Sequence, residues 1–353
     1  MILVGGVACA ILGAGDTSNA GVSSPSPSVA VNISQTIAVI TATSQASSTG
    51  TPGRFASSPI QSATGFVWVP GKNEVLLTTE NEVQAISLSP SMAPSDLMPG
   101  TGYFPADNPS LLSVAREKAI VSWADDERLI SVWQASPNPQ ISTLEQSDSP
   151  ITGMALSPQG DQLAFSDYDH QMEIWDIVDK QSLDSWQVPS WLANLSYSPD
   201  ENQIGGVDLA NFIVYIFNSE TGEVERTLQW SESANPALYG VFFSPDWRYL
   251  AWVARNSVQI MSLESGDLGP QLIHEDFVNA VSWSPDSSLL AVGAAGTVDG
   301  AFVPEIVIWD IQTGQPVETR GEQASIVSLS FSPDGGQLGI LNSSGVFQIW
   351  KLK

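Results

Sequence analysis

Apolar and polar residues alternate in short runs along most of the chain. From residue 54 onward, runs such as LISVWQ from Leu129 and IVIWDI from Ile306 are separated by segments rich in Gly, Pro, Ser and Asp. Period-two alternation between turn residues is typical of antiparallel β-strands and not of helices. The pattern therefore predicts an all-β protein over residues 54–353.

One strand-like run recurs seven times, and each instance carries a large apolar residue at the same place, which we call the landmark. Successive landmarks lie 41 to 48 residues apart, as from Trp309 to Trp350 and from Met261 to Trp309. Seven units of this length predict a repeat architecture. The landmarks are Ile86, Trp133, Trp175, Phe217, Met261, Trp309 and Trp350.

A serine–proline turn precedes the landmark run in five units, between two further apolar runs. Proline presets φ for a turn, and the aspartate that follows it can bond to the backbone beyond. WVPGK from Trp68 and VAREK from Val114 take this place in the first two units. The five turns begin at Ser157, Ser198, Ser244, Ser284 and Ser332.

The Ser-Pro-Asp turns and the Trp-Asp pairs at Trp175 and Trp309 resemble the WD-repeat β-propeller family. The resemblance covers residues 54–353 and implies a seven-bladed β-propeller of four-stranded antiparallel blades. It also implies that Asp169 is the structural aspartate of the third unit. The family's Gly-His dipeptide is absent, and three landmarks are not tryptophan, which weakens the buried side-chain network expected of the family.

Closure of the ring involves both ends of the repeat region. In the resembled family, a repeat supplies three inner strands of one blade and the outer strand of the next, and the seventh unit has only three runs. We expect RFASSPIQ, residues 54–61, to pair beside residues 347–350. This pairing of N- and C-terminal strands would remove an exposed sheet edge.

Residues 1–15, MILVGGVACAILGAG, form an uncharged apolar run that is too short to span a bilayer. The run suits the hydrophobic part of a signal peptide. Residues 6–9 resemble a bacterial lipobox, although Gly6 stands where leucine is preferred, and this predicts lipidation of Cys9. Ala8-Cys9-Ala10 also fits simple cleavage and secretion. An uncleaved start is the third alternative.

Residues 16–53 consist mainly of Ser, Thr, Ala, Pro and Gly, with one acidic and no basic residue. Such a segment cannot bury enough apolar surface to offset its ordering entropy, so we expect a disordered linker with a reach of about 35 Å. The predicted organisation is a leader (1–15), a linker (16–53) and a propeller (54–353). The protein would be extracytoplasmic, either anchored in a membrane through its lipid or secreted.

The net charge narrows the possible partners. The chain of 353 residues has 38 acidic and 12 basic residues, for a formal net charge of −26. A polyanion repels nucleic acid and anionic membrane surfaces, so we expect neither as a partner. We expect the propeller to be monomeric.

Residues and motifs that would indicate catalysis or metal binding are sparse. The sequence has one cysteine, and its two histidines are predicted to be structural: the family resemblance places His274 in blade packing, and His170 falls in a solvated turn. No nucleophile elbow, zinc-protease, P-loop or dinucleotide motif occurs. We therefore predict no enzyme, no cofactor and no metal site.

Three aromatic residues precede the first strands of units four, five and six: Trp191, Tyr239 and Phe277. In the resembled family such positions line one mouth of the ring, where peptides and proteins dock. With the neighbouring acid Asp276, they would suit a basic or amphipathic partner. Packing between blades is the alternative. We expect residues 293–305 to form a long loop, either for binding or as a tolerated insertion.

The favoured function is a non-enzymatic protein-interaction scaffold displayed outside a bacterial cell. It would bind a protein or peptide at one mouth of the propeller. Two alternatives remain open. One is a carbohydrate-binding or hydrolytic propeller that uses carboxylates and tryptophans near the central channel. The other is a fixed subunit of a cell-envelope complex.

Overall fold

The structure is a computed structural model that describes residues 63–352, with gaps at 80–81, 89–97, 106–109, 125–128, 135–139, 147–148, 231–238 and 299–300. All described residues belong to one compact unit that includes residues 52–353. They form 27 β-strands. No helix among them is long and apolar enough to cross a membrane. The predicted leader, linker and closing segment lie outside the described residues.

The strands form seven antiparallel sheets, the blades, numbered here in chain order. The first two blades contain β1 (Ala63–Trp68), β2 (Glu74–Thr79), β3 (Glu82–Ser87) and β4 (Met98–Pro105), then β5 (Ser110–Val114), β6 (Ile120–Ala124), β7 (Leu129–Gln134) and β8 (Gln140–Gln146). The third and fourth contain β9 (Ile151–Leu156), β10 (Gln162–Asp167), β11 (Gln171–Asp176) and β12 (Gln181–Gln187), then β13 (Ala193–Tyr197), β14 (Gln203–Asp208), β15 (Ile213–Asn218) and β16 (Val224–Gln229). The fifth and sixth contain β17 (Gly240–Phe243), β18 (Tyr249–Val253), β19 (Ser257–Ser262) and β20 (Leu268–Ile273), then β21 (Ala280–Trp283), β22 (Leu289–Val298), β23 (Ala301–Asp310) and β24 (Gln315–Gly321). The seventh contains β25 (Ile326–Phe331), β26 (Gln337–Asn342) and β27 (Phe347–Lys351).

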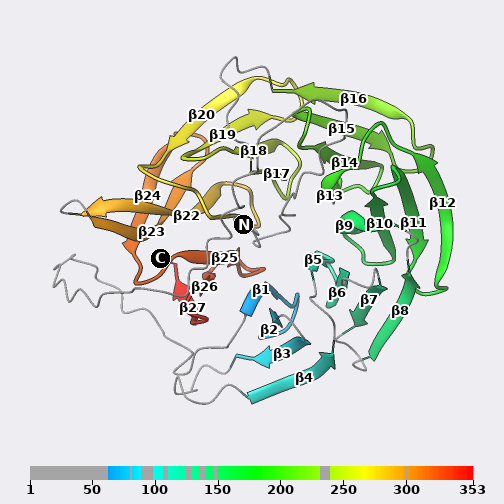
Figure 1. Cartoon of the computed structure of the whole chain (residues 1–353), viewed down its shortest axis with the longest axis horizontal. Helices are drawn as coiled ribbons and strands as arrows, with labels where there is room; N and C mark the ends of the chain where they lie inside the picture. Colours follow the sequence, from blue (N-terminus) through cyan, green and yellow to red (C-terminus); the bar gives the residue numbers. More distant parts are fainter. Residues whose placement is uncertain are drawn as a thin grey trace, which may run out of the picture. The chain divides into compact units, whose positions relative to one another are not determined.

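Strands within each blade are paired in chain order, from the centre of the ring outward (Figure 1). The first strand of each blade lies nearest the centre, and β4, β8, β12, β16 and β20 lie at the rim (Figure 1). Six blades have four strands, and three strands of the seventh are described. The predicted seven-bladed β-propeller is confirmed. The predicted fourth strand of the last blade, residues 54–61, stays a prediction.

The landmarks occupy equivalent places in the third strand of every blade. Each pairs with an apolar residue of the second strand, as in Val121↔Trp133 and Leu338↔Trp350. Six of the seven are buried, and Trp309 is partly buried. The repeat spacing read from the sequence therefore matches the register of the blades.

Each Ser-Pro-Asp turn is held by its own serine. In the fourth blade, the buried Ser198 hydroxyl donates to Asp200 Oδ1 at 2.6 Å and accepts from the backbone N–H of Gln203 at 3.0 Å. Asp200 also accepts from the backbone N–H of Asn202, as predicted. These hydrogen bonds, that from Ser198 first, hold the pKa of Asp200 below its usual value. The same serine–aspartate bond recurs in Ser244–Asp246, Ser284–Asp286 and Ser332–Asp334.

Side chains of the first and seventh blades close the ring. Phe66 in β1 meets Phe347 in β27 edge-on, with ring centroids 4.9 Å apart. The indole N–H of Trp68 donates to the carbonyl of Ser330 in β25 at 2.9 Å. Both contacts belong to one interface, because residues of β1, β2 and β3 share a buried cluster with residues of β26 and β27. The two ends of the repeat region therefore meet in a common core.

Two predictions about local structure are wrong. Residues 293–305 are not a loop, because β22 and β23 continue as a hairpin whose register runs without interruption from Gly293↔Ile306 to Val298↔Ala301. The ladder pairs backbone groups that a loop would leave to solvent. Asp169 is exposed, and Asp167 is the buried aspartate that accepts from the backbone N–H groups of Asp169 and Gln171.

Candidate functional site

The ring has two chemically different ends. Because neighbouring strands run antiparallel, the Ser-Pro-Asp turns between first and second strands all lie at one end, which we call the Ser-Pro-Asp end. The turns between second and third strands, and the connections into each first strand, lie at the other. We call it the aromatic end because Trp191, Tyr239 and Phe277 precede β13, β17 and β21 there.

The predicted aromatic residues lie in two pairs at the aromatic end. Tyr239 and Phe277 meet edge-on, with ring centroids 6.5 Å apart. Trp191 lies 6.0 Å from Tyr168, which is 46% exposed. The guanidinium of Arg255 sits over the Phe277 ring, 4.4 Å from its centroid. Tyr168 and Arg255 could not be predicted from the sequence, because each lies in a short turn and contacts a ring at the entry to the next blade.

Burial supports both interpretations of these aromatics. Trp191 packs against the core between the fourth and fifth blades, and Tyr239 against the core between the fifth and sixth. Yet Trp191, Tyr239, Asp276 and Phe277 are each only partly buried. The same rings therefore anchor blade packing and present apolar edges at the surface.

Two acidic residues, Glu275 and Asp276, directly precede Phe277 in the sequence. Glu275 is exposed beside Asp276, and Glu305 in β23 is partly buried. Burial, and then the charge of Glu275, raise the pKa of Glu305 above its usual value. Carboxylates that repel one another in this way are stabilised when a cation binds nearby.

The histidines lie where the sequence predicted. His274 is buried and meets Trp309 edge-on, with ring centroids 5.5 Å apart. Burial lowers the pKa of His274 to about 4. Its Nε2 atom has no hydrogen-bond partner among the described residues, so the ring serves as a packing group. His170 adopts a φ of 60° in the turn between β10 and β11.

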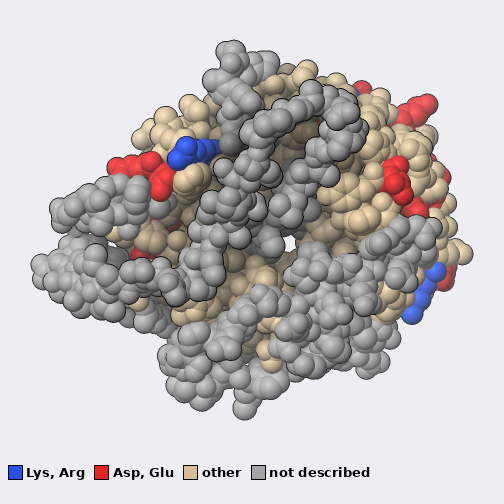
Figure 2. Space-filling view, viewed as in Figure 1, with Lys and Arg blue, Asp and Glu red and all other residues tan. Residues whose placement is uncertain are grey.

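The inner strands enclose a cavity of about 500 Å³. Its lining includes no Asp or Glu among the described residues, so the acid pair that hydrolysis would need is not found there. In the same part of the chain, no three His, Cys, Asp or Glu side chains are grouped to hold a metal ion. Figure 2 shows acidic side chains toward the rim and an opening near the centre, bordered in part by residues that are neither acidic nor basic.

Comparisons with known proteins agree with the fold. Residues 138–176 and 271–300 match the WD40 family, described as "WD domain, G-beta repeat". The chain is 25% identical to Actin-interacting protein 1 of Drosophila melanogaster, over 61% of this chain and 36% of that protein. It is 22% identical to the transcriptional corepressor LEUNIG_HOMOLOG of Arabidopsis thaliana, over 64% of this chain and 27% of that protein.

A shorter match reaches eukaryotic translation initiation factor 3 subunit I of Phaeosphaeria nodorum, with 31% identity over 29% of each chain. In all three cases the match spans less than half the length of the relative. None of the three names denotes an enzyme. The seven blades and the two matched segments together support a WD-repeat β-propeller.

Proposed function

We propose that the protein is a non-enzymatic interaction scaffold that binds a segment of a protein partner at the aromatic end of the ring. The observation that carries the proposal is the row of partly exposed rings on neighbouring blades: Tyr168 with Trp191, and Tyr239 with Phe277. Aromatic side chains on a rigid frame give large contact area at little cost in conformational entropy, and they are enriched in binding hot spots.

The charge around these rings favours a basic or amphipathic segment. Glu275 and Asp276 directly precede Phe277, and the charge of Glu275 acts on Glu305. A Lys or Arg side chain of the partner would relieve this repulsion and stack on the exposed rings. The names of the relatives support a role in protein assembly, since one is called actin-interacting, one a corepressor and one a subunit.

Affinity purification with paired variants tests this proposal. The full chain and a Trp191→Ala/Phe277→Ala variant would each be used to capture proteins from a cell extract, with quantitative mass spectrometry as the readout. Val178→Ser is the control, because Val178 is 77% exposed in a turn at the Ser-Pro-Asp end. We expect a captured protein to be lost from the double variant and kept by the control. Equal capture by all three, with circular dichroism showing folded variants, would contradict the proposal.

We further propose that the propeller is held outside a bacterial cell by a lipid on Cys9, with residues 16–53 as tether. The support is the sequence alone: the apolar leader, the lipobox-like residues before Cys9 and the composition of the tether. A fixed cell-envelope complex would appear in the same purification as a partner in constant ratio to the propeller. A secreted form cleaved after Ala10 is the second candidate.

A further inference from the structure

The cavity inside the ring has features of a site distinct from the aromatic end. All seven blades contribute to its lining, and prolines 70, 245, 285 and 333 of the first turns place it at the Ser-Pro-Asp end. Its walls are largely apolar and include the rings of Trp68, Phe242 and Trp283. A volume of about 500 Å³ lies in the range of small-molecule sites, which is roughly 300–1,000 Å³.

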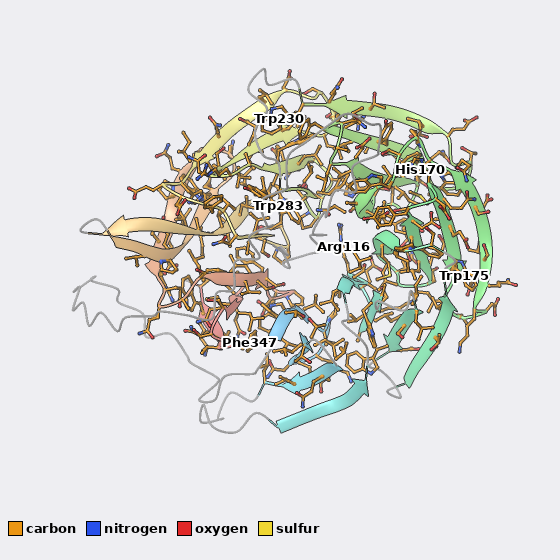
Figure 3. All side chains as sticks on the ribbon, viewed as in Figure 1. Arg116, His170, Trp175, Trp230, Trp283 and Phe347 are labelled. Atoms are coloured by element: carbon orange, nitrogen blue, oxygen red, sulfur yellow. The ribbon has the colours of Figure 1, made fainter. Side chains whose placement is uncertain are left out.

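Arg116 is the one charged residue among the described residues of this lining. It belongs to the turn between β5 and β6, and its side chain points to the centre of the ring (Figure 3). Its Nη1 donates across the channel to the carbonyl of Pro245, in the fifth blade. Arg116 is exposed to solvent, but surrounding protein displaces part of the water around its guanidinium. This burial lowers the pKa of Arg116, and the negative charge of Asp246 raises it in part.

The rest of the guanidinium has no acceptor among the described residues. Pro245 is the acceptor that Arg116 contacts within the described residues, and this bond uses Nη1. The Nε–H and Nη2–H groups form the opposite edge of the fork, which matches the two oxygens of a carboxylate. In a chain with a net charge of −26, this cavity has one described cation and no described acid in its lining. The charge of Asp246, next to Pro245, compensates Arg116 only in part, and the remaining positive charge would attract an anion.

Asn194 is another polar residue in the lining. Asn194 is 7% exposed, and its Nδ2 donates to the carbonyl of Val241 at 2.8 Å. Its Oδ1 atom accepts no hydrogen bond from any described residue. A buried amide oxygen is costly to leave unpaired, so a donor is expected to meet it. Because this oxygen is itself buried, a ligand N–H or O–H group would reach it after a local shift of the Asn194 side chain.

We propose that the channel binds a small organic anion with an apolar body and a hydrogen-bond donor. The carboxylate pairs with the free edge of Arg116, the apolar body packs against the rings of Trp68, Phe242 and Trp283, and the donor meets Asn194 Oδ1. The site does not depend on partner binding at the aromatic end, because its lining includes none of Trp191, Tyr239 or Phe277.

Calorimetric titration of the full chain with matched probes tests this proposal. Indole-3-propionate carries all three features, indole-3-propanamide lacks the charge, and 1-methylindole-3-propionate lacks the donor. We expect the acid to bind about tenfold more tightly than the amide, and several-fold more tightly than the methylated acid. Absence of binding by the acid at millimolar concentration, or equal binding of acid and amide, overturns the proposal. Equal binding of the methylated acid overturns the part assigned to Asn194.

Variants locate the site. Arg116→Gln should weaken indole-3-propionate about tenfold, whereas Arg226→Gln, on the outer strand β16, should leave its affinity unchanged. Equal affinity of the two variants would place the probe elsewhere and overturn the site. The comparison of acid with amide uses the unaltered protein, so it decides the matter even if Arg116→Gln does not fold.

Discussion

At the residue scale, protonation of His274 makes the folding stability of the blade core depend on pH. Its pKa is about 4 in the folded protein, against an ordinary value of 6.5, so between these values the unfolded chain binds a proton that the folded chain does not. Stability should therefore be complete above pH 6.5 and fall as the pH drops toward 4. The pKa difference of about 2.5 corresponds to about 3 kcal/mol.

Urea unfolding at pH 7, 5.5 and 4.5 would measure this loss. In His274→Phe, which keeps a ring against Trp309 but cannot take up a proton, the free energy of unfolding should change less over this range. Identical pH profiles of the two proteins would mean that His274 is not the titrating group.

Backbone conformation at the Ser-Pro-Asp turns can be tested at a single glycine. Gly335 follows Asp334 with a φ of 72°, and a Cβ there would come no closer than 3.6 Å to Pro285, so the cost of Gly335→Ala is conformational rather than steric. We expect a loss of about 1 kcal/mol in the free energy of unfolding. Gly321→Ala is the matched control, since its φ is not positive and the nearest atom is 3.9 Å away. It should change stability by less than about 0.5 kcal/mol, and equal losses would contradict the strain argument.

At the element scale, truncation can test the prediction that residues 54–61 form the closing strand of the seventh blade. The chain without residues 1–53 should unfold at the same urea concentration as the full chain. Removing residues 1–62 stops just before β1 but deletes the predicted strand 54–61. Since a backbone hydrogen bond contributes about 0.5–1.5 kcal/mol, losing several of them should cost about 2–4 kcal/mol. Equal midpoints for the two truncations would show that residues 54–61 do not close the ring.

The blades were predictable because their signals are local. Period-two runs predict the strands, and the Ser-Pro-Asp turns predict the connections between them, all within one repeat of about 40 residues. The landmark residues align the third strand of each blade with the third strand of the next. Residues 293–305 were predicted to form a loop because this segment is longer than its counterparts in the other units. The strands extend into this segment because the backbone pairing of β22 and β23, which begins at Leu289↔Asp310, continues without interruption to Val298↔Ala301.

The candidate sites were only partly predictable. Trp191, Tyr239 and Phe277 were found because each precedes a first strand, a position that can be counted along the repeat. Arg116 could not be predicted, because its hydrogen-bond partner, Pro245, is 129 residues away in the sequence. Only the closed ring brings the two residues together across the channel. No period in the sequence encodes a contact between blades on opposite sides of a ring.

At the scale of the whole molecule, the proposed membrane attachment depends on one residue, Cys9. If Cys9 sulfur carries a diacylglycerol and its amine an acyl chain, Cys9→Ser should move the protein from the membrane to the soluble fraction, because two or more chains hold stably where one does not. Labelling with radioactive palmitate and fractionation would measure this. A wild-type protein that is soluble and begins at Ile11 would support secretion instead. An intact Met1 inside the cytoplasm would contradict both.

The shared core of the first and last blades also sets the order of events during synthesis. Phe66 and Leu77 emerge from the ribosome before the other six blades, but Leu341, Phe347 and Ile349, which complete their cluster, emerge only when the seventh blade is made. Until then the apolar face of the first blade has no native cover, and exposed surface of this kind promotes aggregation. A growing chain therefore exposes this face of the first blade until the seventh blade has been made, and a chaperone or rapid synthesis would limit aggregation during that interval.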